Sequence, residues 1–392
     1  FITHVRLRNE AYTAQQWRLM RSSDGGKTFE IIHEATHATN PPVIESDRHG
    51  NVFLGYVDFE TGDAHLMRFD AARSYRASPL ATIPRGASGK YAMLLDERRG
   101  CLYWFAHNGV FARVSIETGR VTATRIIKDG PDAALQYPSL SLAPDGTLHS
   151  AWTTVRHGQY LYWDIHHMFS ADGSETWRAS GDAAPMSIPI MADQHGPAPR
   201  ITLDDEFTNH TWLSSFLMCS RKLHFLYLAQ TQPPRQHYVR SDPRTGRKEI
   251  DIQPELAGET VSVRGLDGFF AARASLANSP LYCVLPWNGR IACLASDDNG
   301  ATWYDYAVSE ETFSPYALGG CREITSDGWV IGTFTDMRGE IAKKGNRLVF
   351  VRFRAGLCRA DVVAVKHRGG QAVIRFGQHR GQPAAIRIRG SD

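Results

Sequence analysis

The sequence predicts an all-β fold, a seven-bladed β-propeller in a single domain over residues 1–392, with a six-bladed ring as the alternative. Two observations support this prediction: a paired-strand unit that returns along the chain, and an octapeptide that occurs three times. Long helical patterns are scarce. Short alternating runs rich in Val, Ile, Tyr, Phe and Trp, broken by Gly and Asp turns, are typical of strands.

The repeated unit is an apolar strand, a polar turn that usually ends in Gly, and a second, aromatic-rich strand. Four clear copies are PPVIESDRHGNVFLGYVD, YAMLLDERRGCLYWFAHN, YPSLSLAPDGTLHSAWTT and WLSSFLMCSRKLHFLYLA, and weaker copies follow near Ala271 and Leu318. Their intervals of roughly 46 to 76 residues are typical of four-stranded blades with insertions. Six units and an N-terminal piece at 1–38 give seven blades. We expect C-terminal strands, within DVVAVKH or QAVIRF, to pair with the N-terminal blade and close the ring.

The octapeptides SSDGGKTF, SADGSETW and SDDNGATW begin at Ser22, Ser170 and Ser296 and share the pattern Ser-x-Asp-x-(Gly/Ser)-x-Thr-(Trp/Phe). Each follows one predicted strand and precedes another. An Asp in this position can accept hydrogen bonds from the N–H groups of its own turn, and Gly permits a positive φ. We therefore expect turns that join strands rather than catalytic acids. A structural calcium ion stays open, and no other cofactor is expected.

Composition excludes several classes of protein. A net charge of +3 is too small to indicate a nucleic-acid partner, and no apolar run is long enough to span a membrane. The six cysteines lack CxxC or zinc spacing, so we expect buried free thiols. The basic C-terminal stretch is either a solvated edge or a surface that attracts an acidic polymer.

The chain begins at Phe1 without an initiator Met or an apolar signal core, so a removed signal peptide and a trimmed chain are both open. We expect a secreted or periplasmic monomer.

Ligands of propellers are expected at the mouth of the central channel, where the innermost strands begin. Aligning the units on Gly50, Gly100 and Gly146 places Tyr91 and Tyr137 nine residues before their Gly. The same alignment places His107 and Thr153 seven residues after it, and Trp212 takes the tyrosine position in the next unit. Aromatic rings at one level suit stacking on sugars, whereas packing between blades is the alternative interpretation. The residues expected to bind substrate are His37, Asn40, Lys90, Tyr91, His157, His210, Trp212, Arg235 and His237.

The block WDIHHMF suggests a metal site, but His166 and His167 face opposite sides of an extended strand and cannot share a metal through it. We therefore expect no metal site there. Motifs of the GxSxG, HExxH, P-loop and Rossmann types lack a suitable context.

With these motifs the chain resembles, over most of its length, the sialidase-like propellers with Asp-boxes (BNR repeats). The early (Phe/Tyr)-Arg-Ile-Pro motif of sialidases is absent. The pattern is closest to seven-bladed BNR-repeat polysaccharide lyases that act on uronic-acid glycans, on the basis of QYPSLSLAPDGTLHSAW and HHMFSADGSETWRASGDAAPMSIPI. This resemblance implies Tyr137 and His107 in proton transfer and Arg156 or Arg235 on the uronate carboxylate. Thr153 stands where the family's arginine is expected.

The leading functional hypothesis is therefore cleavage of an acidic oligo- or polysaccharide by β-elimination. This reaction needs a base at C5 of the uronate and positive charge at its carboxylate. An exo-glycosidase with an acid among Asp58, Asp267 and Asp336 is the first alternative. A non-catalytic glycan-binding propeller is the second.

Overall fold

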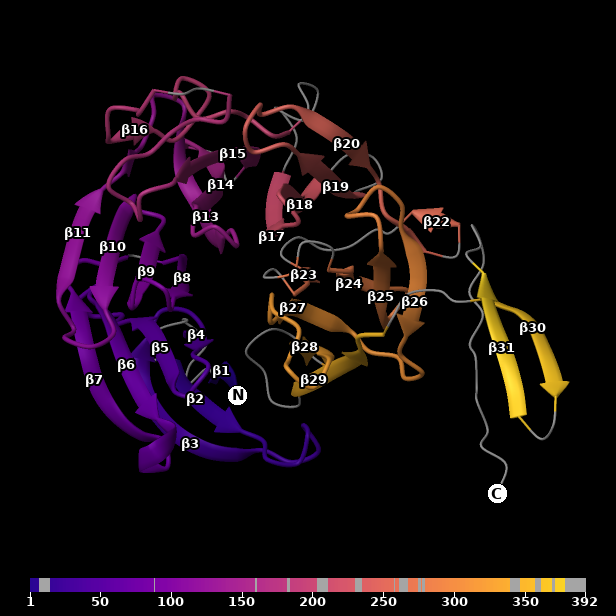
Figure 1. Ribbon diagram of the computed structural model, residues 1–392. Helices are drawn as coiled ribbons and strands as arrows, with labels where there is room; N and C mark the ends of the chain where they lie inside the picture. The colour runs from indigo at the N-terminus through magenta and orange to yellow at the C-terminus, as the bar shows by residue number, and fades with distance from the viewer. Residues whose placement is uncertain are drawn as a thin grey trace.

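The protein is a ring of seven β-sheets around a central axis, as the computed structural model in Figure 1 shows. The structure describes residues 1–6, 15–87, 89–158, 161–181, 184–202, 211–229, 235–256, 258–260, 267–273, 276, 279–338 and 346–356, and the backbone of two further strands at 361–368 and 371–377. The prediction of a seven-bladed β-propeller is confirmed, and the six-bladed alternative is wrong.

The seven sheets are numbered as blades in chain order. Blade 1 comprises β1 (Ile2–Arg6), β2 (Gln15–Arg21) and β3 (Glu30–Ala38). Blade 2 comprises β4 (Val43–Ser46), β5 (Val52–Val57), β6 (Ala64–Asp70) and β7 (Arg76–Ile83). Blade 3 comprises β8 (Tyr91–Asp96), β9 (Cys101–Ala106), β10 (Val110–Ser115) and β11 (Val121–Arg125). Blades 4 and 5 comprise β13 (Ala133–Leu142), β14 (Leu148–Arg156) and β15 (Tyr162–Ser170); and β17 (Thr211–Cys219), β18 (Lys222–Ala229), β19 (Arg235–Ser241) and β20 (Lys248–Ile252). Blades 6 and 7 comprise β23 (Phe269–Ala271), β24 (Leu281–Trp287), β25 (Arg290–Ser296) and β26 (Tyr304–Val308); and β27 (Pro315–Gly320), β28 (Trp329–Asp336) and β29 (Arg347–Arg354). The remaining elements are η1 (Ala71–Arg73), β12 (Ile127–Lys128) with β16 (Ile190–Met191), β21 (Glu255–Leu256) with β22 (Glu259–Thr260), and β30 (Asp361–Arg368) with β31 (Gln371–Gly377).

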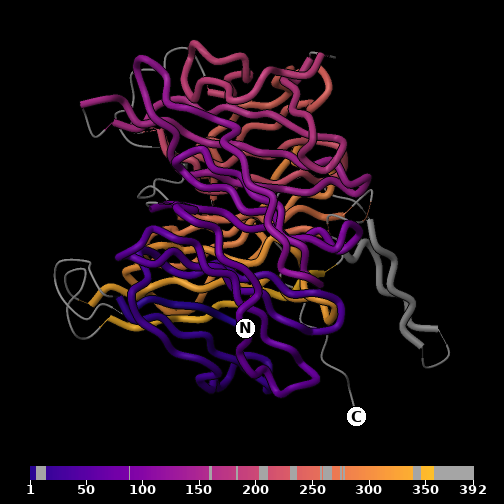
Figure 2. Tube along the Cα trace, turned by 90° about the vertical axis from the view of Figure 1, so that its left-hand side faces the viewer, coloured from indigo at the N-terminus to yellow at the C-terminus, as the bar shows by residue number. Residues whose placement is uncertain are grey.

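Each blade is an antiparallel meander whose first strand lies nearest the axis. The innermost strands are β1, β4, β8, β13, β17, β23 and β27, and successive ones are neighbours around the ring. Figure 2 shows the ring from the side of blades 2 and 3. Because the innermost strands all begin at the same end of the axis, the residues that precede them gather there.

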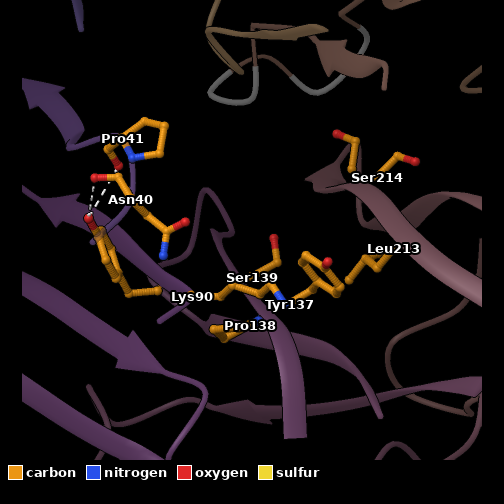
Figure 3. A pocket seen from close by; sticks show the side chains of 10 residues that line it. Asn40, Pro41, Lys90, Tyr137, Pro138, Ser139, Leu213 and Ser214 are labelled. Atoms are coloured by element: carbon orange, nitrogen blue, oxygen red, sulfur yellow. Dashed lines mark hydrogen bonds between the residues drawn. The ribbon is translucent and has the colours of Figure 1, made fainter. Parts of the chain in front are cut away.

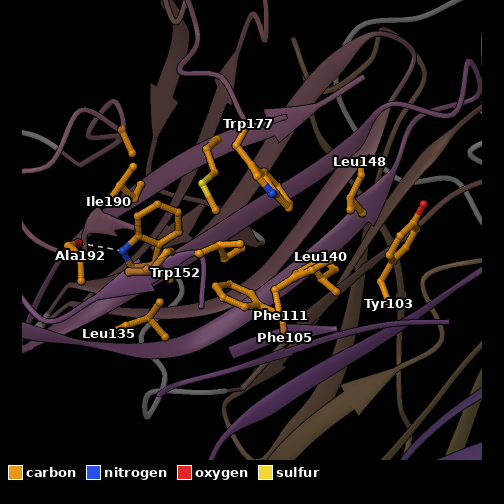
Figure 4. Packing of buried hydrophobic residues seen from close by; sticks show 14 of the residues in the cluster. Tyr103, Phe105, Phe111, Leu135, Leu140, Leu148, Trp152, Trp177, Ile190 and Ala192 are labelled. Atoms are coloured by element: carbon orange, nitrogen blue, oxygen red, sulfur yellow. Dashed lines mark hydrogen bonds between the residues drawn. The ribbon is translucent and has the colours of Figure 1, made fainter. Parts of the chain in front are cut away.

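Apolar side chains fill the spaces between the blades. Between blades 3 and 4, Trp177 packs edge-on against Phe111 with ring centroids 5.2 Å apart, and both side chains are buried (Figure 4). The indole N–H of Trp152 donates to the carbonyl of Ala192 at 2.8 Å, so its burial leaves that donor satisfied. Full burial of a side chain such as Phe111 contributes roughly 1.5–3 kcal/mol, which makes packing between blades a main source of stability.

The three octapeptides form turns with a shared hydrogen-bond pattern, as predicted. In the last copy, Asp298 Oδ1 accepts from the N–H of Thr302 at 2.8 Å and from the hydroxyl of Ser296 at 2.9 Å, while Oδ2 accepts from the Thr302 hydroxyl at 2.7 Å. Asp24 and Asp172 make the equivalent bonds. The oxygens of these carboxylates accept hydrogen bonds from their own turns and so stabilise them.

Contacts between blade 7 and blade 1 close the ring. The rings of Phe29 and Phe350 lie 5.4 Å apart, and the guanidinium of Arg352 donates to the carbonyl of Gly25. The innermost strand of blade 1 is β1, from the N-terminus. The strands β30 and β31 pair with each other, and pairing of a C-terminal strand with blade 1 stays a prediction.

Arg322, in the loop that follows β27, crosses the central channel. Its guanidinium donates to the carbonyls of Leu140 and Met93, and to the carboxylate of Glu45 at 3.1 Å. Burial raises the pKa of Glu45, and the charge of Arg322 opposes that rise. One side chain of blade 7 thereby contacts the innermost strands of blades 2, 3 and 4.

Free thiols were expected to be buried, and four of the cysteines in the described residues are. These are Cys101, Cys219, Cys283 and Cys293. Cys321 is exposed, because it lies in the turn after β27 rather than within a strand, and Cys358 lies outside the described residues. Among the described residues, none of the helices has the length and apolarity that crossing a membrane requires.

Substitution of Gly300 by Ala should destabilise the protein by about 2–4 kcal/mol, because two costs add there. Gly300 has φ +79°, and a Cβ atom would lie 1.8 Å from the hydroxyl of Tyr238. The matched control is Gly100→Ala, at a positive φ of +60° with open space around the Cβ position, which should cost only about 1–2 kcal/mol. Equilibrium unfolding in urea measures both, and equal costs would contradict the packing argument.

The opposite substitution tests the second copy of the turn. Ser174 adopts φ +80° where the other copies have Gly26 and Gly300. Ser174→Gly should raise the free energy of unfolding by up to about 1 kcal/mol, because Gly adopts this conformation without strain. A loss of stability on the same urea assay would show that the Ser side chain contributes more than the strain costs.

Candidate functional site

Three innermost strands are interrupted by β-bulges. The register shifts between Gln136 and Ser139 on β13, between Leu213 and Ser215 on β17, and between Tyr316 and Gly319 on β27. Tyr137 lies in the first bulge and has φ +48°, an unfavourable conformation for a bulky residue. Bulges and backbone strain of this kind concentrate near functional sites, because they redirect side chains.

A pocket of about 290 Å³ lies at the two bulges of β13 and β17 (Figure 3). Residues before and within the innermost strands of blades 2 to 5 form its wall, at the end of the axis predicted from the sequence. The lining residues are Asn40, Pro41, Lys90, Tyr91, Tyr137, Pro138, Ser139, Leu213, Ser214 and Ser215. No Asp or Glu is among these described lining residues, and Lys90 is the charged one.

Lys90 is held between aromatic rings. Its Nζ donates to Gln136 Oε1 at 2.9 Å and to the hydroxyl of Tyr162 at 3.2 Å, and it lies 4.2 Å from the ring centroid of Tyr137. Burial lowers the pKa of Lys90 to about 8. This amine therefore titrates close to neutral pH, where it can bind an anion or exchange a proton.

Tyr137, Tyr162 and Trp212 form an aromatic cluster beside this lysine. The hydroxyl of Tyr137 donates to that of Tyr162 at 3.3 Å, and the two rings meet edge-on with centroids 5.0 Å apart. Trp212 packs on Tyr162 at 5.2 Å and on Tyr137 at 6.3 Å. The cluster thus links Lys90 to the Tyr137 hydroxyl through Tyr162.

The sequence analysis missed Tyr162. Tyr162 begins β15, the third strand of blade 4. A third strand lies farther from the channel than the innermost strand, so Tyr162 was not expected near the site. A register shift between Thr153 and Thr154 leaves Asp164 as an extra residue with φ +38°. Asp adopts positive φ more readily than most residues, so its presence in the strand is the sequence signal for this bulge. An Asp alone is too weak a signal to predict the bulge.

Tyr91 and Asn40 have structural contacts in addition to their place in the pocket wall. The Tyr91 ring stacks on Trp104 with centroids 4.6 Å apart, and its hydroxyl donates to the carbonyls of Asn40 and Pro41, each at 3.2 Å (Figure 3). Burial raises the pKa of Tyr91 far above its usual value. Asn40 Nδ2 donates to the carbonyl of Gly89 at 3.0 Å and so holds the residue before Lys90.

His107 lies behind the pocket wall rather than in it. Its Nδ1 accepts from the backbone N–H of Lys90 at 3.0 Å, and its own backbone N–H donates to the Lys90 carbonyl at 2.9 Å. Burial lowers the pKa of His107. The imidazole therefore contacts the main chain of Lys90.

Arg156 and His157 lie outside the pocket. Arg156 on β14 pairs with Ala133 on β13, and Ala133 stands four residues before Tyr137. At about 3.3 Å per residue, Arg156 and Tyr137 therefore lie roughly 13 Å apart along the strand direction. Its guanidinium covers the ring of Trp163 at 5.1 Å, and it is exposed. His157 Nε2 is 2.9 Å from the carbonyl of Gly130.

Of the other predicted binding residues, His37 and His237 are not among the described residues that line this pocket. His37 Nδ1 lies 3.2 Å from Glu60 Oε1 near the surface. His237, in the third strand of blade 5, is buried against Tyr227 with ring centroids 5.0 Å apart. Arg235 begins β19, but its side chain is not described, and His210 lies outside the described residues.

The three carboxylates proposed for a hydrolase are engaged in the scaffold. Asp58 Oδ1 accepts from the N–H groups of Glu60 and Thr61 in its own turn, both at 2.9 Å. Asp267 Oδ1 accepts from the N–H of Leu318 at 2.8 Å.

Asp336 also has structural partners. The N–H of Ser314 and the guanidinium of Arg347 lower the pKa of Asp336 to about 2. Its Oδ2 lies 2.9 Å from Arg347 and 3.0 Å from Arg338. A carboxylate held in this way is a poor proton donor at neutral pH.

The neighbouring histidines of β15 face opposite sides of the sheet, as predicted. His166 Nε2 lies 3.1 Å from Asp164 Oδ2, whereas His167 lies 3.2 Å from His149 and 2.9 Å from Ser180. Within the described part of the chain, no group of three or more His, Cys, Asp and Glu side chains could hold a metal ion.

Comparison with known proteins finds similar folds among solved structures. No protein-family model matches the sequence, and no curated protein matches it significantly. Among solved structures, the chain is similar to an ulvan lyase, a polysaccharide lyase, bound to -[GlcA(1-4)Rha3S]-, with a TM-score of 0.57 and 12% identity over 88% of this chain and 87% of that one. It is also similar to an α-L-arabinanase of Penicillium chrysogenum complexed with arabinobiose, with a TM-score of 0.50 and 11% identity over 80% of this chain and 92% of that one. At these identities the similarity shows a shared fold.

The reactivity of Lys90 tests the geometry of the pocket without reference to function. Its rate of modification by a small amine-reactive reagent, followed by mass spectrometry of the peptide, should reach half its maximum near pH 8. Exposed lysines should follow their ordinary pKa of about 10.4. A Lys90 midpoint near that ordinary value would contradict the burial of its ammonium group.

Proposed function

We propose that the protein is a glycan-active enzyme that cleaves a uronic-acid-containing polysaccharide by β-elimination in this pocket. One observation carries the proposal: a single desolvated cation and a tyrosine hydroxyl converge in a pocket whose described lining contains no carboxylate. This arrangement matches the needs of proton abstraction beside a carboxylate. It does not match the pair of carboxylic acids that most glycoside hydrolases require.

Lys90 binds the uronate carboxylate in this proposal. An ammonium group has three donors, and Gln136 and Tyr162 accept two of them. The ammonium also lies 4.2 Å from the centroid of the Tyr137 ring, and in this proposal its positive charge attracts the substrate carboxylate. Neutralising the carboxylate stabilises the negative charge that develops when C5 loses its proton.

Tyr137 transfers the proton. Tyr137 acts as a phenolate in this proposal: the Tyr162 hydroxyl, which accepts from Tyr137 in this structure, then donates to the Tyr137 oxygen, and that oxygen takes the proton from C5. The C4–O bond breaks as the C4–C5 double bond forms, and the leaving oxygen receives the proton from Tyr137. The products are a reducing end and an unsaturated uronate, without consumption of water. The similar fold of the ulvan lyase, solved with a glycan that contains GlcA, supports this choice of substrate class.

A screen of acidic polysaccharides and sialosides, read by both reducing ends and ultraviolet absorbance, tests the reaction. We expect absorbance to rise in step with new reducing ends, because β-elimination leaves a conjugated unsaturated uronate. Reducing ends without absorbance would indicate hydrolysis and overturn the proposal. Binding without either product would indicate a non-catalytic glycan-binding propeller.

Tyr137→Phe should lower kcat by about 10²–10⁴-fold, because it removes the proton-transferring oxygen and keeps the ring. Lys90→Met should lower kcat/KM by about 10–100-fold, since a hydrogen bond to a charged group contributes about 1.5–3 kcal/mol. Tyr304→Phe, on the outer strand of blade 6, is the matched control and should retain full activity. Full activity of Tyr137→Phe would contradict the assignment of that residue.

A further inference from the structure

His107 and Arg156 are the predicted catalytic residues without a place in the pocket lining, and of these two His107 contacts Lys90. It follows β9 directly and is not among the residues that line the pocket. Its imidazole is aimed at the backbone of Lys90 rather than at the cavity. The imidazole is half-buried, and its contact with the Lys90 main chain indicates a role other than binding substrate directly.

The short segment that carries Lys90 is fixed from both sides. Asn40, from blade 2, donates to the Gly89 carbonyl at 3.0 Å, and His107, from blade 3, accepts the Lys90 N–H at 3.0 Å. Gly89 also leaves room for the imidazole, because a Cβ atom there would lie 2.9 Å from His107 Cε1. Two side chains, one amide and one imidazole, thus act with the backbone bond from His107 N–H to the Lys90 carbonyl to hold the main chain from which the lysine extends.

The bond between Lys90 and His107 selects one form of the ring. Nδ1 can accept an N–H only when it carries no proton, so the neutral imidazole has its proton on Nε2. Protonation would convert Nδ1 into a donor, whose nearest acceptor is the Lys90 carbonyl at 3.4 Å. Burial, together with the charge of Lys90, lowers the pKa of His107 and favours the neutral form, while the Lys90 carbonyl and Asp129 oppose this shift.

We propose that His107 is a positioning residue, which places the Lys90 ammonium in the pocket by accepting the Lys90 backbone N–H at Nδ1. This inference rests on the proposed function only for its catalytic readout. It replaces a direct part of His107 in proton transfer with an action through Lys90. The displacement of one catalytic group by about 1 Å can cost about 10²-fold in rate, so the effect on activity is large.

Three substitutions of His107 separate the two roles. Asn places a carbonyl oxygen where Nδ1 lies, so His107→Asn keeps the acceptor but cannot act as an imidazole acid or base. Gln extends its acceptor to the position of Nε2, and Ala has none. We expect His107→Asn to retain kcat/KM within about 3-fold, and His107→Gln and His107→Ala to lose about 10²-fold.

The pH midpoint for modification of Lys90 provides a readout that does not depend on catalysis. It should stay near pH 8 in His107→Asn and rise towards the ordinary lysine value of about 10.4 in His107→Ala, since the released side chain becomes solvated. Gly89→Ala should raise it in the same direction by pushing the imidazole away from Lys90. Circular dichroism and thermal unfolding identify any variant that fails to fold.

The outcomes distinguish this inference from the proposed function. If the wild-type protein cleaves no uronate glycan but the Lys90 midpoints behave as stated, the proposed function fails and the positioning role stands. If His107→Asn is as inactive as His107→Ala while the Lys90 midpoint is unchanged in both, His107 transfers a proton itself and the inference is overturned. Unchanged activity and unchanged midpoints in all variants would also overturn it.

Discussion

Closure of the ring is the constraint on which the rest of this structure depends. Blade 7 meets blade 1 through side chains: the Phe29 and Phe350 rings, and the bond from Arg352 to the Gly25 carbonyl. A Cβ atom on Gly26 would lie 2.2 Å from the ring of Phe350, so this junction tolerates no bulk. The innermost strands of blades 2 to 5 supply the pocket wall, away from the junction of blades 7 and 1. The positions of these strands depend on a closed ring of seven blades.

The fold was largely predictable because its signals are local. A Gly that ends a hairpin turn and an Asp that satisfies its own turn act within a few residues, and both recur at blade spacing. The same repeat indicated at which end of the central axis the candidate site lies. Tyr91, Tyr137 and Trp212 occupy equivalent places in their units, and the structure brings all three to one end of the axis.

The arrangement within that level was less predictable, since it depends on strand register. Arg156 ends β14 opposite Ala133, four residues before Tyr137 on β13, and this pairing places it beyond the pocket. Tyr162 contacts Lys90 and Tyr137 behind the pocket wall, on a strand whose register changes at the bulge at Asp164. Single-residue shifts of this kind arise from tertiary packing, and neither composition nor periodicity encodes them. His107 was predicted at the channel, and in the structure its imidazole contacts the backbone of Lys90, which a pattern of side chains does not reveal.

Arg322 has a consequence for how a polymer can approach this protein. Its guanidinium contacts Glu45, Met93 and Leu140 on three innermost strands and so occupies part of the space between them. Under the proposed function, a glycan chain therefore reaches the pocket across the face of the ring rather than along its axis.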